Sequence, residues 1–228
     1  MGFDLKEEEI KDLRSKYKGV QAEPEEILKT AEQIQDNYLP SSVAIGNLTT
    51  IDGAQSTKTR RPLSASVDLV TQEKTGLEQL GRDYESWTHM GAYFADVNDL
   101  EIGVIYSEQF PLWSFPDETF ANSYKADIRN HNVVLAEPAS NVASKVNRML
   151  GGDVTKNSDA VDLASHLHWS IHSERSSINE IAMRISDTVD GPYDTAIEEV
   201  EEVMDVFNST ERKKLEDALT EFEKILSN

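Results

Sequence analysis

One aspartate lies in the middle of a segment whose alternation predicts a β-strand. Residues 63–71 alternate roughly in period two between polar and apolar side chains, and Asp68 stands between Val67 and Leu69. A carboxylate buried in a sheet costs free energy unless it is paired or binds a metal. The same alternation lets Asp68 face solvent while Val67 and Leu69 face inward. The segment therefore predicts either a metal-binding carboxylate or a solvated strand residue.

A second stretch with candidate chemistry runs from residue 132 to residue 167. A predicted strand at 132–136 precedes Pro138 and a helix that carries Lys145, and a glycine break follows. Beyond that break, Asp159 and Asp162 are three residues apart, so they share one face of a predicted helix. Capping of that helix by Ser158 or Asp159 explains these residues equally well.

The histidines offer a different chemistry. His168 and His172 are four residues apart on one predicted helix face, a spacing that suits Zn²⁺. The residues between them are Trp-Ser-Ile, so the glutamate of a His-Glu-x-x-His protease site is missing. Two histidines without a third ligand are typical of helix packing or of a surface, which is the alternative to a zinc site.

The elements that would position these residues follow from periodicity and from breaking residues. We expect helices over residues 4–17, 24–38 and 73–88, and a polar loop over 52–62. Strands are expected at 63–71, 101–106 and 132–136, with a further helix after Pro138. Three or four strands are too few for a barrel, so the pattern predicts an α+β fold with a small mixed sheet flanked by helices.

The last third of the sequence has a helical pattern. Residues 159–186 predict one or two helices, and apolar residues over 197–226 recur every three or four positions. The latter segment predicts an antiparallel helical hairpin, whose apolar stripe packs on the rest of the chain or on another subunit. We therefore divide the chain into residues 1–150, an α/β domain with N-terminal helices, and residues 151–228, a helical region.

Two blocks of this sequence together resemble the nucleotidyltransferase fold, in particular the AbiEii-like branch of abortive-infection toxins. The first is the glycine turn at Gly46-Asn47, the basic loop at 58–61 and the strand Ser-Ala-Ser-Val-Asp-Leu-Val at 64–70. The second is the strand at 133–135, then Lys145, and then Lys156 with the acids that follow it. The resemblance covers roughly residues 25–170. It implies a nucleotidyltransferase-like first domain.

The resemblance also implies roles for individual residues. Asp68 and Glu101 would be the catalytic carboxylates and would hold Mg²⁺. The implied contacts to the nucleotide come from Gly46, Asn47, Ser66 and Lys145. The implied partners are an NTP and an RNA or protein hydroxyl. The family has an aspartate where this chain has Ser66, and serine does not supply that charge to a divalent metal.

Charge and composition limit the other function classes. The chain has 42 acidic and 22 basic residues, which give a formal net charge of −20, and it has no cysteine. Such a charge repels phosphate backbones, so a general nucleic-acid coat protein is not expected, unless the acids are a halophilic adaptation that says little about partners. Thiolate metal sites and disulfides are excluded.

The N-terminal sequence and the apolar runs bear on location. The first nine residues are acidic and have no apolar segment of a signal peptide, and no apolar run approaches a membrane span. We therefore expect a cytoplasmic protein without a membrane partner. The alternative to a nucleotidyltransferase is a non-enzymatic interaction or structural protein on the same scaffold, an oligomer of a virus or mobile element. The C-terminal helices would form its interface.

Overall fold

The computed structural model describes residues 20–57, 63–89, 91–106, 120–150 and 177–186, with Leu163, His166, Leu167 and residues 212, 213, 216, 217, 219, 220, 223 and 224. Several predictions lie outside these residues: the helix over 4–17, the basic loop over 58–61, the acids Asp159 and Asp162, the histidine pair, and most of the C-terminal hairpin. Two compact units emerge from the contacts within the chain, and we describe each by itself.

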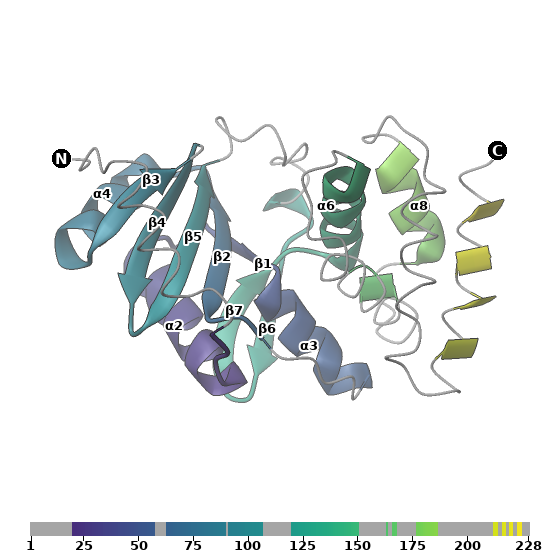
Figure 1. Ribbon diagram of the computed structural model, residues 1–228, viewed down its shortest axis with the longest axis horizontal. Coiled ribbons are helices and arrows are strands. Elements are labelled where there is room, and N and C mark those ends of the chain that lie inside the picture. Colours follow the sequence, from purple (N-terminus) through teal and green to yellow (C-terminus); the bar gives the residue numbers. More distant parts are fainter. Residues whose placement is uncertain are drawn as a thin grey trace. The chain divides into compact units, whose positions relative to one another are not determined.

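The first unit contains a mixed sheet. Its strands in the described part of the chain are β1 (Val43–Ile45), β2 (Ser66–Thr71), β3 (Ser86–His89), β4 (Ala92–Val97), β5 (Leu100–Tyr106), β6 (Tyr124–Ile128) and β7 (His131–Leu135). The spatial order is β3-β4-β5-β2-β1-β7-β6 (Figure 1). β2 runs parallel to β5 and β1 parallel to β7, and the other neighbours are antiparallel. The predicted α+β class with a mixed sheet is confirmed, although the sheet is larger than expected.

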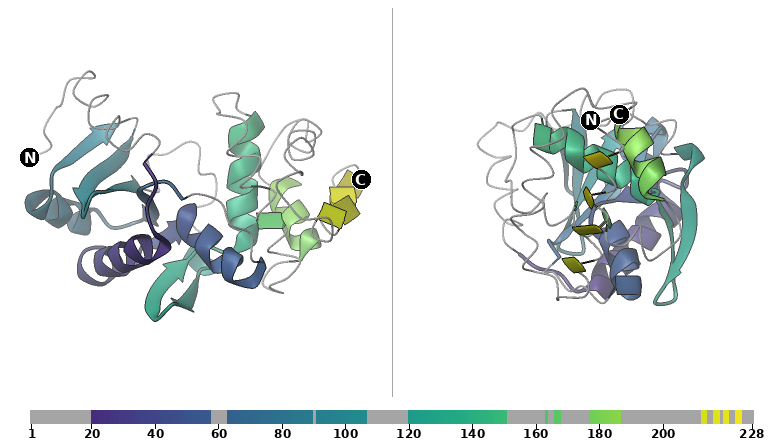
Figure 2. Two further views of the ribbon diagram at one scale, coloured as in Figure 1. Left: turned by 60° about the horizontal axis from the view of Figure 1, so that its bottom comes forward. Right: turned by 90° about the vertical axis from the view of Figure 1, so that its right-hand side faces the viewer.

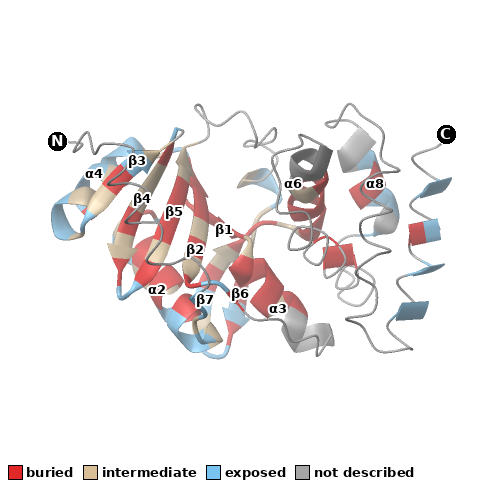
Figure 3. Cartoon of the chain, in the orientation of Figure 1, coloured by how far each residue is buried: buried red, intermediate tan, exposed pale blue. Residues whose placement is uncertain are grey.

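One face of the sheet carries the hydrophobic core. On β2 the buried side chains of Val67 and Leu69 alternate with half-buried positions. Buried and half-buried positions also alternate over the last three residues of β4 and the first three of β5 (Figure 3). Two helices contribute to this core, α2 (Pro24–Asn37) through Ile27 and Ile34, and α4 (Lys74–Asp83) through Leu80. Residues of opposite parity along each strand therefore lie on the other face, where the candidate site is built.

Two of the tight hairpins turn on residues without glycine. Asn98 and Asp99 connect β4 to β5 with φ of 56° and 63°, and Arg129 and Asn130 connect β6 to β7 with φ of 52° and 67°. Positive φ at both central residues gives the backbone twist that two-residue hairpins favour. The usual sequence signal for such a turn is Asn-Gly or Asp-Gly, so these hairpins are poorly marked in the sequence. That is one reason why β4 and β6 are not predicted from the sequence.

A glutamine of α2 joins β7 to the segment before β1. Gln35 is 4% exposed, and its Oε1 accepts a hydrogen bond from the Val134 amide at 2.9 Å. Its Nε2 donates to the carbonyl oxygens of Val134 at 3.0 Å and Ser42 at 3.1 Å. The side-chain amide therefore forms the two backbone hydrogen bonds to Val134 that a neighbouring strand would form. Next to it, β1 and β7 pair at Ala44–Leu135.

A histidine binds the β6–β7 hairpin to α2, which lies beside it (Figure 2). His131 contacts Glu32 through Nδ1 at 2.7 Å and Glu25 through Nε2 at 3.0 Å. The other oxygen of Glu32 accepts the Asn132 amide at 2.8 Å. The hydrogen bonds to Glu32 and Glu25 raise the pKa of His131 above its usual 6.5, whereas the Asn132 amide and then His131 lower the pKa of Glu32 below 4.5.

This contact predicts a pH window of stability. A raised histidine pKa stabilises the folded chain fully below pH 6.5 and loses that effect as pH rises through the raised value. A lowered glutamate pKa contributes above pH 4.5 and is lost as pH falls through the lowered value. We therefore expect His131→Gln to lower the midpoint of urea unfolding more at pH 5.5 than at pH 8.5. The control is His89→Gln on the far edge strand, and equal losses at both pH values would contradict the prediction.

The second unit is helical in its described part. α6 (Pro138–Leu150) buries Ala139, Val142 and Val146, and it packs on α8 (Ile178–Ser186). α8 begins with a capping box, in which the Glu180 amide donates to Ser177 Oγ at 3.2 Å while the Glu180 carboxylate accepts the Ser177 amide. This unit begins its main segment at Glu137, whereas the sequence analysis places a boundary at residue 150.

Two local predictions are wrong. Residues 52–57, expected in a polar loop, belong to α3 (Asn47–Thr57), whose apolar residues gather on no single face and so give no helical pattern. The helix expected over 73–88 ends at Asp83, and β3 follows it. Among the described residues, no helix is both long enough and apolar enough to cross a membrane.

Candidate functional site

The strand that carries Asp68 places it on the face opposite the core. Val67 and Leu69 are both 0% exposed, and Asp68 between them is half-buried. The pairing of β2 with β5 sets Ser66 opposite Glu101 and Asp68 opposite Gly103. Since registered partners project to the same side of a sheet, Ser66, Asp68 and Glu101 share one face. Val67 and Leu69 thus face inward as the alternation predicts, and Asp68 lies on the opposite face, where it is partly exposed.

Two glycines enclose the carboxylate of Asp68. A Cβ atom at Gly103 would lie 2.9 Å from Asp68 Oδ1, and one at Gly46 would lie 3.1 Å from Asp68 Oδ2. Gly46 also has a φ of 63°, which side-chain-bearing residues rarely adopt. The Cβ atom of any other residue at position 103 would therefore take up space that the Asp68 carboxylate occupies. The glycine predicted on resemblance to approach the nucleotide lies directly beside the predicted metal ligand.

An amide and two hydroxyls form a network next to this carboxylate. Asn47 is 4% exposed, and its Nδ2 lies 2.9 Å from Ser64 Oγ and 3.2 Å from Ser66 Oγ. It also donates to the carbonyl oxygens of Ser64 and Ser66, each at 3.0 Å. The two serine hydroxyls are 3.0 Å apart. The amide of Asn47 thus holds the start of α3 against the start of β2 and fixes the position of Ser66.

Glu101 brings a second carboxylate to the face and has an acidic neighbour that the sequence analysis missed. Glu101 lies on β5 beside Ser66, and its Oε2 is buried. Asp96 on β4 pairs directly with Glu101 in the antiparallel register. Like charges at directly opposite positions repel, so a cation near this pair is favoured. Asp96 ends the segment Tyr-Phe-Ala-Asp before a turn at Asn98-Asp99, and the two aromatic residues, which are common in strands, are the available signal.

The donor set fits Mg²⁺ that arrives with a nucleotide. Within the described residues there is no group of three or more His, Asp or Glu side chains arranged to hold a metal ion by themselves. Mg²⁺ is commonly bound by one or two carboxylates together with substrate phosphates. Asp68, which lies between Gly46 and Gly103, and Glu101 on the adjacent strand would be the two carboxylates of such a site. Ser66 adds a neutral oxygen where a third charge would otherwise be.

The remaining predicted residues belong to the second unit or lie outside the described residues. Lys145 is a half-buried residue of α6 and belongs to the second unit. His166 is 1% exposed in that unit, while His168 and His172, the candidate zinc pair, lie outside the described residues. The structure therefore assembles five of the six predicted residues: Gly46, Asn47, Ser66, Asp68 and Glu101.

The fold itself is similar to that of a solved structure. The antigenic nucleotidyltransferase-like protein from Paracoccidioides brasiliensis superposes with a TM-score of 0.50 and 16% sequence identity. The match covers 85% of this chain and 95% of that chain. No protein-family model matches the sequence, and a search of characterised proteins gives no match. The likeness shows that the chain has a nucleotidyltransferase-like fold.

Proposed function

We propose that this chain binds a nucleoside triphosphate with Mg²⁺ and transfers its nucleotide to a hydroxyl group. The observation that carries the proposal is the Asp68 carboxylate, held between Gly46 and Gly103 one strand away from Glu101. A strand carboxylate fitted so closely between two glycines is not required by the hydrophobic core, to which β2 contributes Val67 and Leu69 from its opposite face. The nucleotidyltransferase-like fold supports the same assignment.

The strands on either side of Asp68 suggest separate sites for the donor and for the acceptor of the reaction. β1 lies on one side, and Gly46 and Asn47 follow it at the start of α3, where backbone amides of the first turn have no helical acceptor. A helix N-terminus favours phosphate groups, so we assign the donor triphosphate to this side. β5 and β4 lie on the other side, which we assign to the acceptor.

In the proposed reaction, the acceptor hydroxyl oxygen forms a bond to the α-phosphorus of the triphosphate. The bond from that phosphorus to the bridging oxygen breaks, pyrophosphate departs with the electron pair, and the hydroxyl proton passes to water. Bound Mg²⁺ would neutralise charge on the phosphate oxygens. Asp68 and Glu101 would hold it. Asn47 and Gly46 keep Ser66 and Asp68 in fixed positions, so the chain's own part is orientation.

The proposal is tested with the purified chain, Mg²⁺ and each of the four NTPs labelled at the α-phosphate. We expect label in an added RNA or protein, and a rise in melting temperature when NTP and Mg²⁺ are present together. A ligand at 100 times its Kd stabilises the folded state by about 2.7 kcal/mol, enough for a clear shift. EDTA should remove both effects. No label with any nucleotide and an unchanged melting temperature would contradict the proposal.

Ser66 favours one alternative function. The family that this chain resembles has a charged aspartate at this position, whereas serine is neutral. The Ser66 hydroxyl already accepts a hydrogen bond from Asn47. A non-enzymatic interaction protein on the same scaffold needs no catalytic charge at this position. Mass measurement in solution distinguishes the two, because a stable oligomer or defined complex without nucleotide binding is expected only of the interaction protein. The relationship to abortive-infection toxins stays a prediction.

A further inference from the structure

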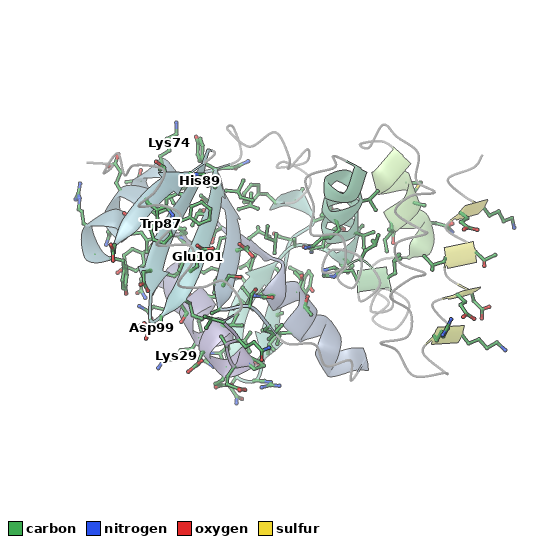
Figure 4. All side chains as sticks on the ribbon, viewed as in Figure 1. Lys29, Lys74, Trp87, His89, Asp99 and Glu101 are labelled. Atoms are coloured by element: carbon green, nitrogen blue, oxygen red, sulfur yellow. The ribbon has the colours of Figure 1, made fainter. Side chains whose placement is uncertain are left out.

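A row of registered residues crosses four adjacent strands on the face of Asp68. Asp68 on β2 pairs with Gly103 on β5, Gly103 pairs with Phe94 on β4, and Phe94 pairs with Trp87 on β3. Registered partners project to the same side of a sheet, so an aromatic pair lies on the acceptor side of the carboxylate. Trp87 on β3 and Glu101 on β5 mark this part of the sheet in Figure 4.

Phe94 and Asp68 approach one another above Gly103. The position that a Gly103 Cβ would take lies 3.5 Å from Phe94 Cε1 and 2.9 Å from Asp68 Oδ1. Ring and carboxylate are therefore separated by one residue that contributes no side chain. A molecule that contacts the ring is within a few ångströms of the carboxylate assigned to the reacting phosphate.

Trp87 supports the ring of Phe94 from the opposite side. The two rings are stacked, with centroids 5.8 Å apart and an interplanar angle of 12°. Trp87 is 2% exposed, whereas Phe94 is half-buried. The buried indole thus fixes the orientation of a ring that is itself partly accessible, and a flat group placed on that ring would continue a parallel stack.

We propose that Phe94, held by Trp87, is the surface on which the acceptor's nucleobase stacks, so that the acceptor is a nucleoside hydroxyl and not a protein side chain. This inference rests on the proposed transfer reaction and names its acceptor. Every nucleobase offers a π-face for parallel stacking, and such stacking on a protein aromatic contributes about 1–3 kcal/mol per base. A tyrosine phenol is the competing acceptor, and its ring packs edge-to-face as readily as in parallel, as Tyr38 and Tyr84 do at 67°.

The charge of this face favours recognition by stacking. Its described charged residues on β2, β4 and β5 are the acids Asp68, Asp96 and Glu101. Acids repel a polyphosphate backbone, so contacts to several phosphates are not favoured here. A terminal nucleoside whose base stacks on Phe94 presents its hydroxyl toward Asp68 without needing those contacts.

The test is calorimetric titration with adenosine, with the donor side first filled by Mg²⁺ and α,β-methylene ATP and then left empty. We expect Phe94→Leu to weaken adenosine binding by about five- to 160-fold, as loss of one stacked base predicts. Phe94→Tyr keeps a ring and should bind adenosine as the wild type does. Phe120→Leu, the same substitution at a half-buried phenylalanine outside the row, should also leave adenosine binding unchanged. In transfer assays, Phe94→Leu should raise the KM for the acceptor and leave the affinity for NTP unchanged.

Three results would overturn the inference. These are adenosine binding that is equally tight in Phe94→Leu, the absence of adenosine binding by the wild type, and Phe94-dependent binding of the peptide Gly-Tyr-Gly in place of adenosine. Melting curves identify a Phe94→Leu protein that does not fold, and in that case Phe94→Tyr against Phe94→Ile gives the comparison. Failure of the proposed function appears separately, as NTP binding that does not depend on Asp68, and the adenosine titration does not require transfer.

Discussion

Asp68→Asn is expected to lower nucleotide transfer by about 100-fold or more, the size of loss typical when one electrostatic contact to a reacting group is removed. Asparagine keeps the shape of the side chain in the cradle of Gly46 and Gly103 but removes its negative charge. Since Mg²⁺ binds carboxylate oxygens far better than amide oxygens, the NTP-dependent rise in melting temperature should disappear as well.

The matched control for this variant is Asp127→Asn. Asp127 is also a strand aspartate of the first unit, but it is exposed on β6. We expect its transfer rate and its NTP-dependent melting shift to equal those of the wild type. Both proteins are compared without nucleotide first, so that a loss of folding is not mistaken for a loss of binding. Wild-type transfer by Asp68→Asn would remove this carboxylate from the proposed mechanism.

Gly76→Ala should destabilise the first unit by about 1–3 kcal/mol, the usual cost of overpacking a well-packed site. A Cβ at Gly76 would lie 2.0 Å from the Tyr38 carbonyl oxygen and 2.7 Å from Leu39 Cδ2. The close atom is backbone, so α4 as a whole must move away from the end of α2. Glycine to alanine within a helix ordinarily stabilises by up to about 1 kcal/mol, so the expected sign is reversed here.

A second glycine of the same helix provides the comparison. A Cβ at Gly81 would meet Tyr93 Oη at 2.5 Å and Ser86 Oγ at 2.9 Å, both at the ends of side chains that can turn aside. Gly81→Ala should therefore lose less stability than Gly76→Ala in urea or thermal unfolding. If Gly76→Ala unfolds at a higher urea concentration than the wild type, the described packing of α4 on α2 is wrong.

The sequence predicted the strand that carries Asp68, because Val67 and Leu69 alternate with it and the core selects one face. Glu101 lies on the neighbouring strand, since β5 pairs with β2, and its role at the metal stays a prediction. The other strands were harder to predict. β1 has three residues, too few for a period, and the turns Asn98-Asp99 and Arg129-Asn130 lack the glycine that usually marks a hairpin.

The parts of the site that escaped prediction depend on pairing between strands. Asp96 joins Glu101 only through the β4–β5 register, and Phe94 reaches Asp68 only across Gly103. The backbone around Asn47 is predicted from the resemblance to contact the nucleotide, and the structure adds that its side-chain amide bonds Ser64 and Ser66. Asn47 lies 17 and 19 positions before these two serines, and Phe94 lies two strands away from Asp68. Periodicity within a single strand or helix does not predict such contacts.

The side chain of Gln35 has a consequence for local unfolding. The β6–β7 hairpin pairs with β1 at Ala44–Leu135. Other backbone groups of this hairpin form hydrogen bonds to side chains of α2, namely Glu32 and Gln35. Hydrogen bonds that end on a side chain are released by a rotation of that side chain, without opening the neighbouring strand. The amides of this hairpin should therefore exchange with deuterium as one cooperative block, ahead of β2 and β5. The half of the sheet that carries Asp68 would then stay folded while its other edge opens.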